Sequence, residues 1–286
     1  MIETPIFIPN GEERLAGVVA LPEGRPRGLA VLLQGLGAPR SHKYGLWTRS
    51  ARELAGRGIA SLRIDHPTLG DSTGILHADL HDPPVDEFVA ATRAVMEIIG
   101  VDVYAAVGNC MGGRTALGLA AALPGCASVG CILPGNLDSI LPQRDERFER
   151  RRVAGARRLA ARIPGLKKAI RKLRRSDGVP LRIRFLPVLP TALRSSRVQV
   201  LYLGAEEPYD RLRRNLQALQ ETLVEADRLQ MTRIPSGKIT SFRLPIDLQS
   251  HVIDAVVTWI DETMPGAARP ASGMPLAGVA ERVRSS

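Results

Sequence analysis

Cysteine, aromatic residues and long apolar runs are all scarce in this 286-residue chain. Three cysteines cannot form the disulfide framework of a small secreted domain. The absence of any run of about 18 apolar residues excludes a transmembrane helix. The first ten residues also lack the basic start and long apolar stretch of a signal peptide, so we expect a cytoplasmic protein. The 44% of apolar residues still allow a substantial core.

Positive charge is concentrated in one segment. Residues 143–197 contain 18 Lys and Arg but only 4 Asp and Glu. This local excess is larger than the net charge of +10 of the whole chain, so the remainder is mildly acidic. The basic character therefore belongs to one insert. We do not expect nucleic acid as its partner, because the insert has few aromatic residues and no recognisable binding motif.

Short apolar runs alternate with longer segments of helical period, which is typical of a mostly parallel sheet with helices on both faces. The expected strands are 17–21, 29–33, 59–64, 103–107, 129–133, 198–203 and 231–234. The expected helices are 44–56, 85–99, 111–123, 209–226 and 252–264. The helix 111–123 is apolar on nearly all sides, so we expect it to lie deep in the fold.

The regular alternation stops after the strand 129–133 and resumes with the strand 198–203. We therefore assign residues 1–137 and 197–264 to one α/β core, 138–196 to a basic helical lid and 265–286 to a flexible tail. Within the lid, basic residues fill one helical face and apolar residues recur at spacings of three and four on the other: Leu159, Ile163, Leu166, Ile170 and Leu173.

The strand 103–107 leads through Gly108-Asn109-Cys110-Met111-Gly112-Gly113 directly into the deep helix. This G-x-C-x-G-G pattern, in a strand, turn and helix setting, is what a nucleophile elbow requires. We expect the turn to be too tight for side chains at Gly108 and Gly112. We also expect the helix N-terminus to lower the pKa of the Cys110 thiol and favour the thiolate nucleophile.

Two further segments fit the same architecture. The strand 29–33 leads into Gln34-Gly35-Leu36-Gly37, whose small side chains would let backbone N–H groups face the site, and Leu36 and Met111 are the candidate oxyanion-hole donors. The stretch from Arg63 to Ser72 resembles the R-x-D-x-x-G-x-G-x-S pattern of α/β-hydrolases. Its second glycine is Gly70, and its first is replaced.

The chain resembles an α/β-hydrolase with the order cysteine, acid, histidine. His251 is the only histidine after Cys110, just ahead of the expected last helix, and is therefore the candidate base. The acid should follow the strand 198–203, where Glu207 is the first choice. The alternative acids are Glu206, Asp210 and Asp138.

The G-x-C-x-G-G box resembles those of dienelactone hydrolases, polyhydroxyalkanoate synthases and bile-acid-type acyl-CoA N-acyltransferases. The resemblance implies an enzyme that accepts an acyl group, from a thioester on CoA or an acyl-carrier protein, onto Cys110 and passes it to water or another nucleophile. One alternative is a dienelactone-hydrolase-like or carboxylic ester hydrolase. Another is a non-catalytic binding protein whose basic insert docks an acidic partner.

We expect neither a cofactor nor a metal. His77 and His81 have a metal-like spacing, with Asp79 and Asp82 nearby, but they lie in a proline-bounded loop without a clear fixed geometry. The lid occupies the place that covers the nucleophile in α/β-hydrolases. Its basic face could meet CoA phosphates, an acidic carrier protein or an anionic membrane.

Overall fold

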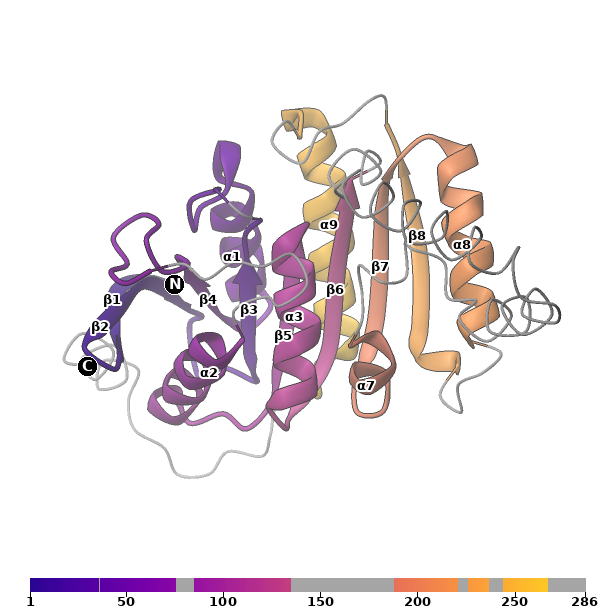
Figure 1. The fold of residues 1–286 in the computed structure, drawn as a ribbon. Coiled ribbons are helices and arrows are strands. Elements are labelled where there is room, and N and C mark those ends of the chain that lie inside the picture. The colour runs from indigo at the N-terminus through magenta and orange to yellow at the C-terminus, as the bar shows by residue number, and fades with distance from the viewer. Residues whose placement is uncertain (36, 76–84, 135–187, 221–225, 237–243, 267–286) are drawn as a thin grey trace, which may run out of the picture.

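The structure is a computed structural model that describes residues 1–35, 37–75, 85–134, 188–220, 226–236 and 244–266. Its centre is one sheet of eight strands (Figure 1). In chain order the strands are β1 (Ile2–Asn10), β2 (Glu13–Leu21), β3 (Leu29–Leu33), β4 (Ala60–Ile64), β5 (Tyr104–Asn109), β6 (Cys126–Pro134), β7 (Arg197–Gly204) and β8 (Leu229–Pro235).

The strands lie in the order β1-β2-β4-β3-β5-β6-β7-β8. β2 pairs antiparallel with both β1 and β4, and every other neighbouring pair is parallel. Parallel neighbours place the carboxyl ends of β3 and β5 at the same edge of the sheet. The loop after Leu33 and the turn after Asn109 therefore meet at this edge.

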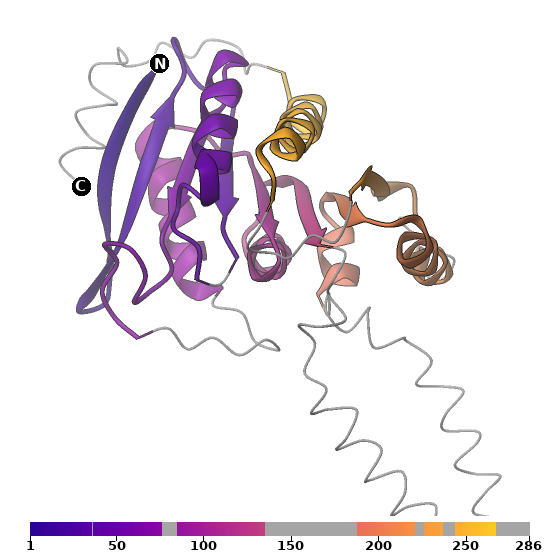
Figure 2. The same ribbon diagram turned by 90° about the horizontal axis from the view of Figure 1, so that it is seen from above.

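Helices cover both faces of the sheet (Figure 2). They are α1 (Leu46–Gly56), α2 (Asp86–Ile99), α3 (Met111–Ala122), α7 (Leu189–Leu193), α8 (Glu206–Gln220) and α9 (Ile246–Thr263), with short 3₁₀ turns η1 (Lys43–Gly45) and η3 (Ala226–Arg228). Apolar residues of α1 and α9 pack on one face. Those of α2, α3, α7 and α8 pack on the other, so successive residues of a strand such as β3 enter different cores.

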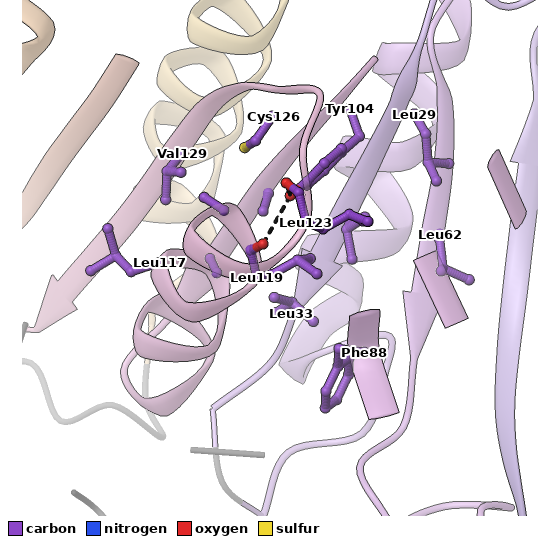
Figure 3. Close-up of a cluster of buried hydrophobic side chains, with 14 of the residues drawn as sticks. Leu29, Leu33, Leu62, Phe88, Tyr104, Leu117, Leu119, Leu123, Cys126 and Val129 are labelled. Carbon is purple, nitrogen blue, oxygen red and sulfur yellow. Dashed lines mark hydrogen bonds between the residues drawn. The ribbon is translucent and has the colours of Figure 1, made fainter. Parts of the chain in front are cut away.

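A buried tyrosine ties β5 to the helix that follows it (Figure 3). The Tyr104 hydroxyl, at the start of β5, lies within hydrogen-bond distance of the carbonyl oxygens of Leu119 and Leu123, at 3.0 and 2.8 Å. Both carbonyls lie at the C-terminal end of α3, where Leu123 is the C-cap and its N–H also donates to the Leu119 carbonyl at 2.8 Å. The strand and helix that flank Cys110 are thus fixed to each other at the end far from the cysteine.

The predicted α/β class, the mostly parallel sheet and the deep position of α3 are confirmed. Residues 138–187 of the predicted basic lid lie outside the described part of the chain. Inside the range assigned to the lid, α7 packs its leucines into the main core, where Leu189 and Leu193 are fully buried. Among the described residues, no helix combines the length and apolar character needed to cross a membrane.

Candidate active site

Cys110 forms the corner between β5 and α3. β5 ends at Asn109 and α3 begins at Met111, as predicted for the strand, turn and helix. The cysteine has φ 55° and ψ −117°, a conformation that non-glycine residues rarely adopt. Its N–H donates to the carbonyl of Ile132 on β6 at 3.0 Å. A strained residue of this kind costs about 1–3 kcal/mol and marks a candidate functional position.

The two glycines of the motif are required by close backbone contact. A Cβ on Gly108 would overlap the backbone of Gly112 and lie 2.6 Å from the nitrogen of Gly113. A Cβ on Gly112 would overlap the carbonyl of Leu33, at the end of β3. The prediction that this turn excludes both side chains is confirmed. The same contacts bring α3 against the strand that leads into the neighbouring loop.

The loop after β3 lies directly beside the corner. A Cβ on Gly35 would lie 3.3 Å from the Cβ of Cys110, and the Gly35 N–H donates to Oδ1 of Asn109 at 2.9 Å. Leu36, one candidate oxyanion donor, lies outside the described residues. Met111, the other, is the first residue of α3, where backbone N–H groups lack intrahelical partners. Both roles stay predictions.

The turn after β4 explains the Arg63–Ser72 motif. The buried Asp65 accepts from the Arg40 N–H at 2.7 Å and forms an ion pair with the Arg40 guanidinium. Gly70 has φ 56°, and a Cβ there would overlap the Asp65 carboxylate. Thr68, which replaces the first glycine of the pattern, keeps a left-handed φ of 68°. The replacement therefore preserves the backbone path of a glycine.

Residues 30–181, more than half of the chain, match the family model of the alpha/beta hydrolase fold. The chain belongs to the α/β-hydrolase fold family. This assignment agrees with the strand order, the sharp corner at Cys110 and the turn after β4.

Three solved structures resemble this chain over most of its length. An esterase of Pyrococcus furiosus is 12% identical, with a TM-score of 0.58 and coverage of 92% of each chain. Dienelactone hydrolase of Anabaena variabilis is 16% identical, with a TM-score of 0.54 and coverage of 92% of this chain and 99% of that one. A serine hydrolase without a lid from Xanthomonas campestris is 16% identical, with a TM-score of 0.56 and coverage of 93% and 97%. These similarities support the fold, and no curated protein matches the chain.

The Cys110 thiol has a different acidity from the one predicted. Burial raises its pKa, and the Met111 backbone, which hydrogen-bonds to it, lowers the pKa by less. The expected net lowering by the helix N-terminus is therefore wrong, because Cys110 is only 8% exposed. The shift favours the neutral thiol, so nucleophilic attack would require a base.

His251 is exposed and lies inside α9, not ahead of it as predicted, because α9 begins at Ile246. Its Nδ1 lies 3.2 Å from the Asp247 carbonyl oxygen, one turn earlier. Among the residues that the structure describes, no hydrogen bond joins His251 to Cys110. The structure thus leaves the role of His251 as base a prediction, and its Nε2 is the atom available for proton transfer.

The candidate acids are divided between helix α8 and residues outside the description. α8 begins at Glu206, three residues earlier than predicted, so Glu206, Glu207 and Asp210 are helical. Glu206 is exposed and lies 4.0 Å from the Arg233 guanidinium. The Glu207 side chain and the whole of Asp138 are outside the described set. The choice of Glu207 therefore stays a prediction.

Two buried histidines near the corner were missed by the sequence analysis. His42 is 4% exposed, and its Nε2 lies 3.1 Å from Nδ2 of Asn109. His66 is 1% exposed, and its Nε2 lies 3.2 Å from the carbonyl oxygen of Gln34. His42 belongs to no motif, and His66 occupies an unspecified position of the Arg63–Ser72 pattern. The only available signal was their position in the segments that follow β3 and β4.

These histidines should make the protein less stable in acid. Burial is the main cause that lowers the pKa of both rings. At His42 a backbone hydrogen bond with Lys43 raises the pKa and the Lys43 charge lowers it, whereas at His66 the backbone hydrogen bond with Gln34 and the charges of Asp65 and Glu87 all raise it; burial outweighs these effects at both rings. An unfolded histidine titrates near 6.5, so the unfolded chain takes up these protons first as the pH falls. We expect the free energy of unfolding to decrease below about pH 6.5 in urea titrations.

The matched control is the double variant His42→Gln, His66→Gln, which removes both titrating rings. Its free energy of unfolding should vary less between pH 7.5 and 5.5 than that of the natural chain. An equal dependence in both proteins would show that other groups cause it.

No group of three or more potential metal ligands occurs in the described part of the chain. The metal-like segment with His77 and His81 lies within residues 76–84, outside the description.

Proposed function

We propose that this α/β-hydrolase-fold protein is a hydrolase or acyltransferase that takes an acyl group from a thioester onto Cys110. The observation that supports this most is the strained position of Cys110, at the start of α3 and beside Gly35. The first N–H groups of a helix have no intrahelical partner, so a thiol at the start of α3 is suited to oxyanion stabilisation by the Met111 N–H. The donor would be a thioester of CoA or of an acyl-carrier protein, docked by the basic insert.

In the proposed reaction, Sγ of Cys110 attacks the thioester carbonyl while His251 takes the thiol proton. The oxyanion accepts hydrogen bonds from the backbone N–H groups of Leu36 and Met111, and Glu207 orients the imidazole. The donor C–S bond then breaks, and the leaving thiolate receives the proton from His251. Water or another nucleophile, deprotonated by the same histidine, finally attacks the acyl-cysteine. The acyl–sulfur bond breaks, and His251 returns the proton to Sγ.

A second function is hydrolysis of an ester or enol-lactone through the same residues. The names of two similar structures, an esterase and a dienelactone hydrolase, favour it. Thioester transfer has the advantage that one thioester replaces another, so the acyl group stays activated on Cys110.

Intact-mass spectrometry distinguishes these functions. The full chain is mixed with an acyl-CoA, the same acyl group on a small uncharged thiol, and the corresponding ester. The proposal is supported if an acyl adduct forms faster from the thioesters than from the ester and if this adduct is lost in Cys110→Ala. Preference for the ester supports the second function. The absence of an adduct and of product with every donor would contradict both and favour a binding protein.

His251→Ala should lower kcat by about 10²- to 10⁴-fold, because a general base contributes on this scale. The fold should be unaffected, since the side chain is exposed on α9. Asp254→Ala, an exposed change on the same helix, is the matched control and should keep the natural rate. If both variants turn over at the natural rate, the base is another group.

A further inference from the structure

Asn109 connects the nucleophile to two groups with opposite hydrogen-bonding needs. Its Oδ1 accepts the Gly35 N–H at 2.9 Å, and its Nδ2 lies 3.1 Å from Nε2 of His42. A backbone N–H can only donate, so the amide oxygen must face Gly35 and the amide nitrogen must face the ring. Nε2 of His42 is therefore the acceptor, and the neutral ring carries its proton on Nδ1.

His66 holds the same loop with the opposite tautomer. The Gln34 carbonyl oxygen can only accept, so Nε2 of His66 must carry the proton that lies between them. The Gln34 side chain also donates from Nε2 to the Ile64 carbonyl at 2.7 Å. Residues 34 and 35 are thus held from two sides, by His66 as a donor and by Asn109 with His42 behind it.

We propose that Asn109 and His42 are positioning residues, which hold the Gln34–Gly35 loop against Cys110 for the reaction and do so only while His42 is neutral. The inference rests on the proposed function. Gly35 is close enough to Cys110 that an added Cβ would lie 3.3 Å from the cysteine Cβ. Any rotation of the Asn109 amide would move this loop relative to the thiol.

Protonation of His42 would break the arrangement. A second N–H on Nε2 would face the Asn109 amide, which is also a donor there. The amide could then turn its oxygen to the ring only by withdrawing it from Gly35. The ring packs edge-on against Trp47 of α1, with centroids 6.1 Å apart, and the neighbouring charge of Lys43 also opposes protonation.

The variants Asn109→Asp and Asn109→Leu separate positioning from simple packing. Aspartate keeps an acceptor for Gly35 and can accept a hydrogen bond from Nε2–H of His42, so kcat should stay within about tenfold. Leucine has a similar shape but no acceptor, so kcat should fall on the order of 10²-fold, while KM changes less than about threefold. This split is expected because the loop contributes more to the transition state than to substrate binding.

His42→Gln supplies the rescue test, because its side-chain oxygen can replace the Nε2 acceptor without titrating. It should retain kcat within about threefold at pH 7.5, whereas His42→Leu should resemble Asn109→Leu. Equal kcat in Asn109→Asp, Asn109→Leu and the natural protein would overturn the proposal. If Asn109→Leu and His42→Leu do not fold, an equal reduction of kcat in Asn109→Asp and His42→Gln would overturn the proposal.

Nitrogen-15 NMR of the histidine rings tests the arrangement without turnover. The natural protein should show His42 protonated on Nδ1 and His66 on Nε2, and Asn109→Asp should place a proton on Nε2 of His42. A natural His42 with its proton on Nε2 would overturn the proposal. If the natural chain reacts with no acyl donor, that result contradicts the proposed function alone. The tautomers of His42 and His66 still test the hydrogen-bond arrangement around Asn109.

Discussion

Cys110→Ala should abolish acyl-adduct formation and lower turnover by about 10⁴- to 10⁶-fold, the scale seen when a catalytic nucleophile is removed. The substitution deletes only the sulfur atom, and alanine adopts the left-handed φ of 55° at a cost similar to that of cysteine. The unfolding midpoint should therefore change little. Turnover should be measured with the best donor from the mass-spectrometric panel, and a variant that keeps more than about a tenth of the natural rate would show that Cys110 is not the nucleophile.

Two controls make this result specific. Cys110→Ser keeps the shape of the side chain but replaces the thiol by a hydroxyl that is much harder to deprotonate, so little activity should remain. Cys126 and Cys131 are buried core residues, and burial raises their pKa values to about 11 and 12. Iodoacetamide at pH 9.5 should therefore label the natural chain once and Cys110→Ala not at all.

Periodicity predicted the succession of strands and helices along the core because each strand is a short apolar run between clear turn residues. The strand 29–33 has the predicted bounds, and α2 ends at Ile99 and is capped by Gly100, whose φ of 71° suits that position. β1 was missed because Pro5 and Pro9 interrupt its alternation. An edge strand tolerates these prolines, since it pairs with β2 alone.

The ends of α8 and α9 were harder to predict than their centres. Both begin earlier than predicted, α8 at Glu206 and α9 at Ile246. This displacement matters for the site, because it places His251, Glu206 and Glu207 within helices instead of loops. Local sequence could identify these residue types, but their reach toward Cys110 depends on tertiary packing.

The corner at Cys110 was predictable because its geometry follows from a continuous motif. The contacts that His42 and His66 make with Asn109 and Gln34 were not, since these residues come from segments distant in sequence. The acidity of Cys110 also depends on distant segments: the helix N-terminus is a local feature, whereas the burial that outweighs it is produced by the surrounding fold. Local motifs therefore located the candidate nucleophile but not the direction in which its pKa is shifted.

Gly112→Ala should prevent stable folding or destabilise the protein by at least about 3 kcal/mol, because overpacking against a rigid backbone has no easy relief. The added Cβ would overlap the Leu33 carbonyl and lie 2.7 Å from the Gln34 carbonyl oxygen. Both groups are backbone atoms at the end of β3, so neither can rotate away as a side chain could. Urea denaturation followed by circular dichroism measures the loss.

The matched control for this prediction is Gly56→Ala, at the last residue of α1, where a Cβ meets nothing within 4 Å. That variant should lie within about 1 kcal/mol of the natural chain. If Gly112→Ala does fold, the Cβ must have displaced the end of β3 and with it the Gln34–Gly35 loop, so kcat should fall more than KM rises. A Gly112→Ala protein with natural stability and natural kcat would contradict the close contact between α3 and β3 on which the whole description of the corner depends.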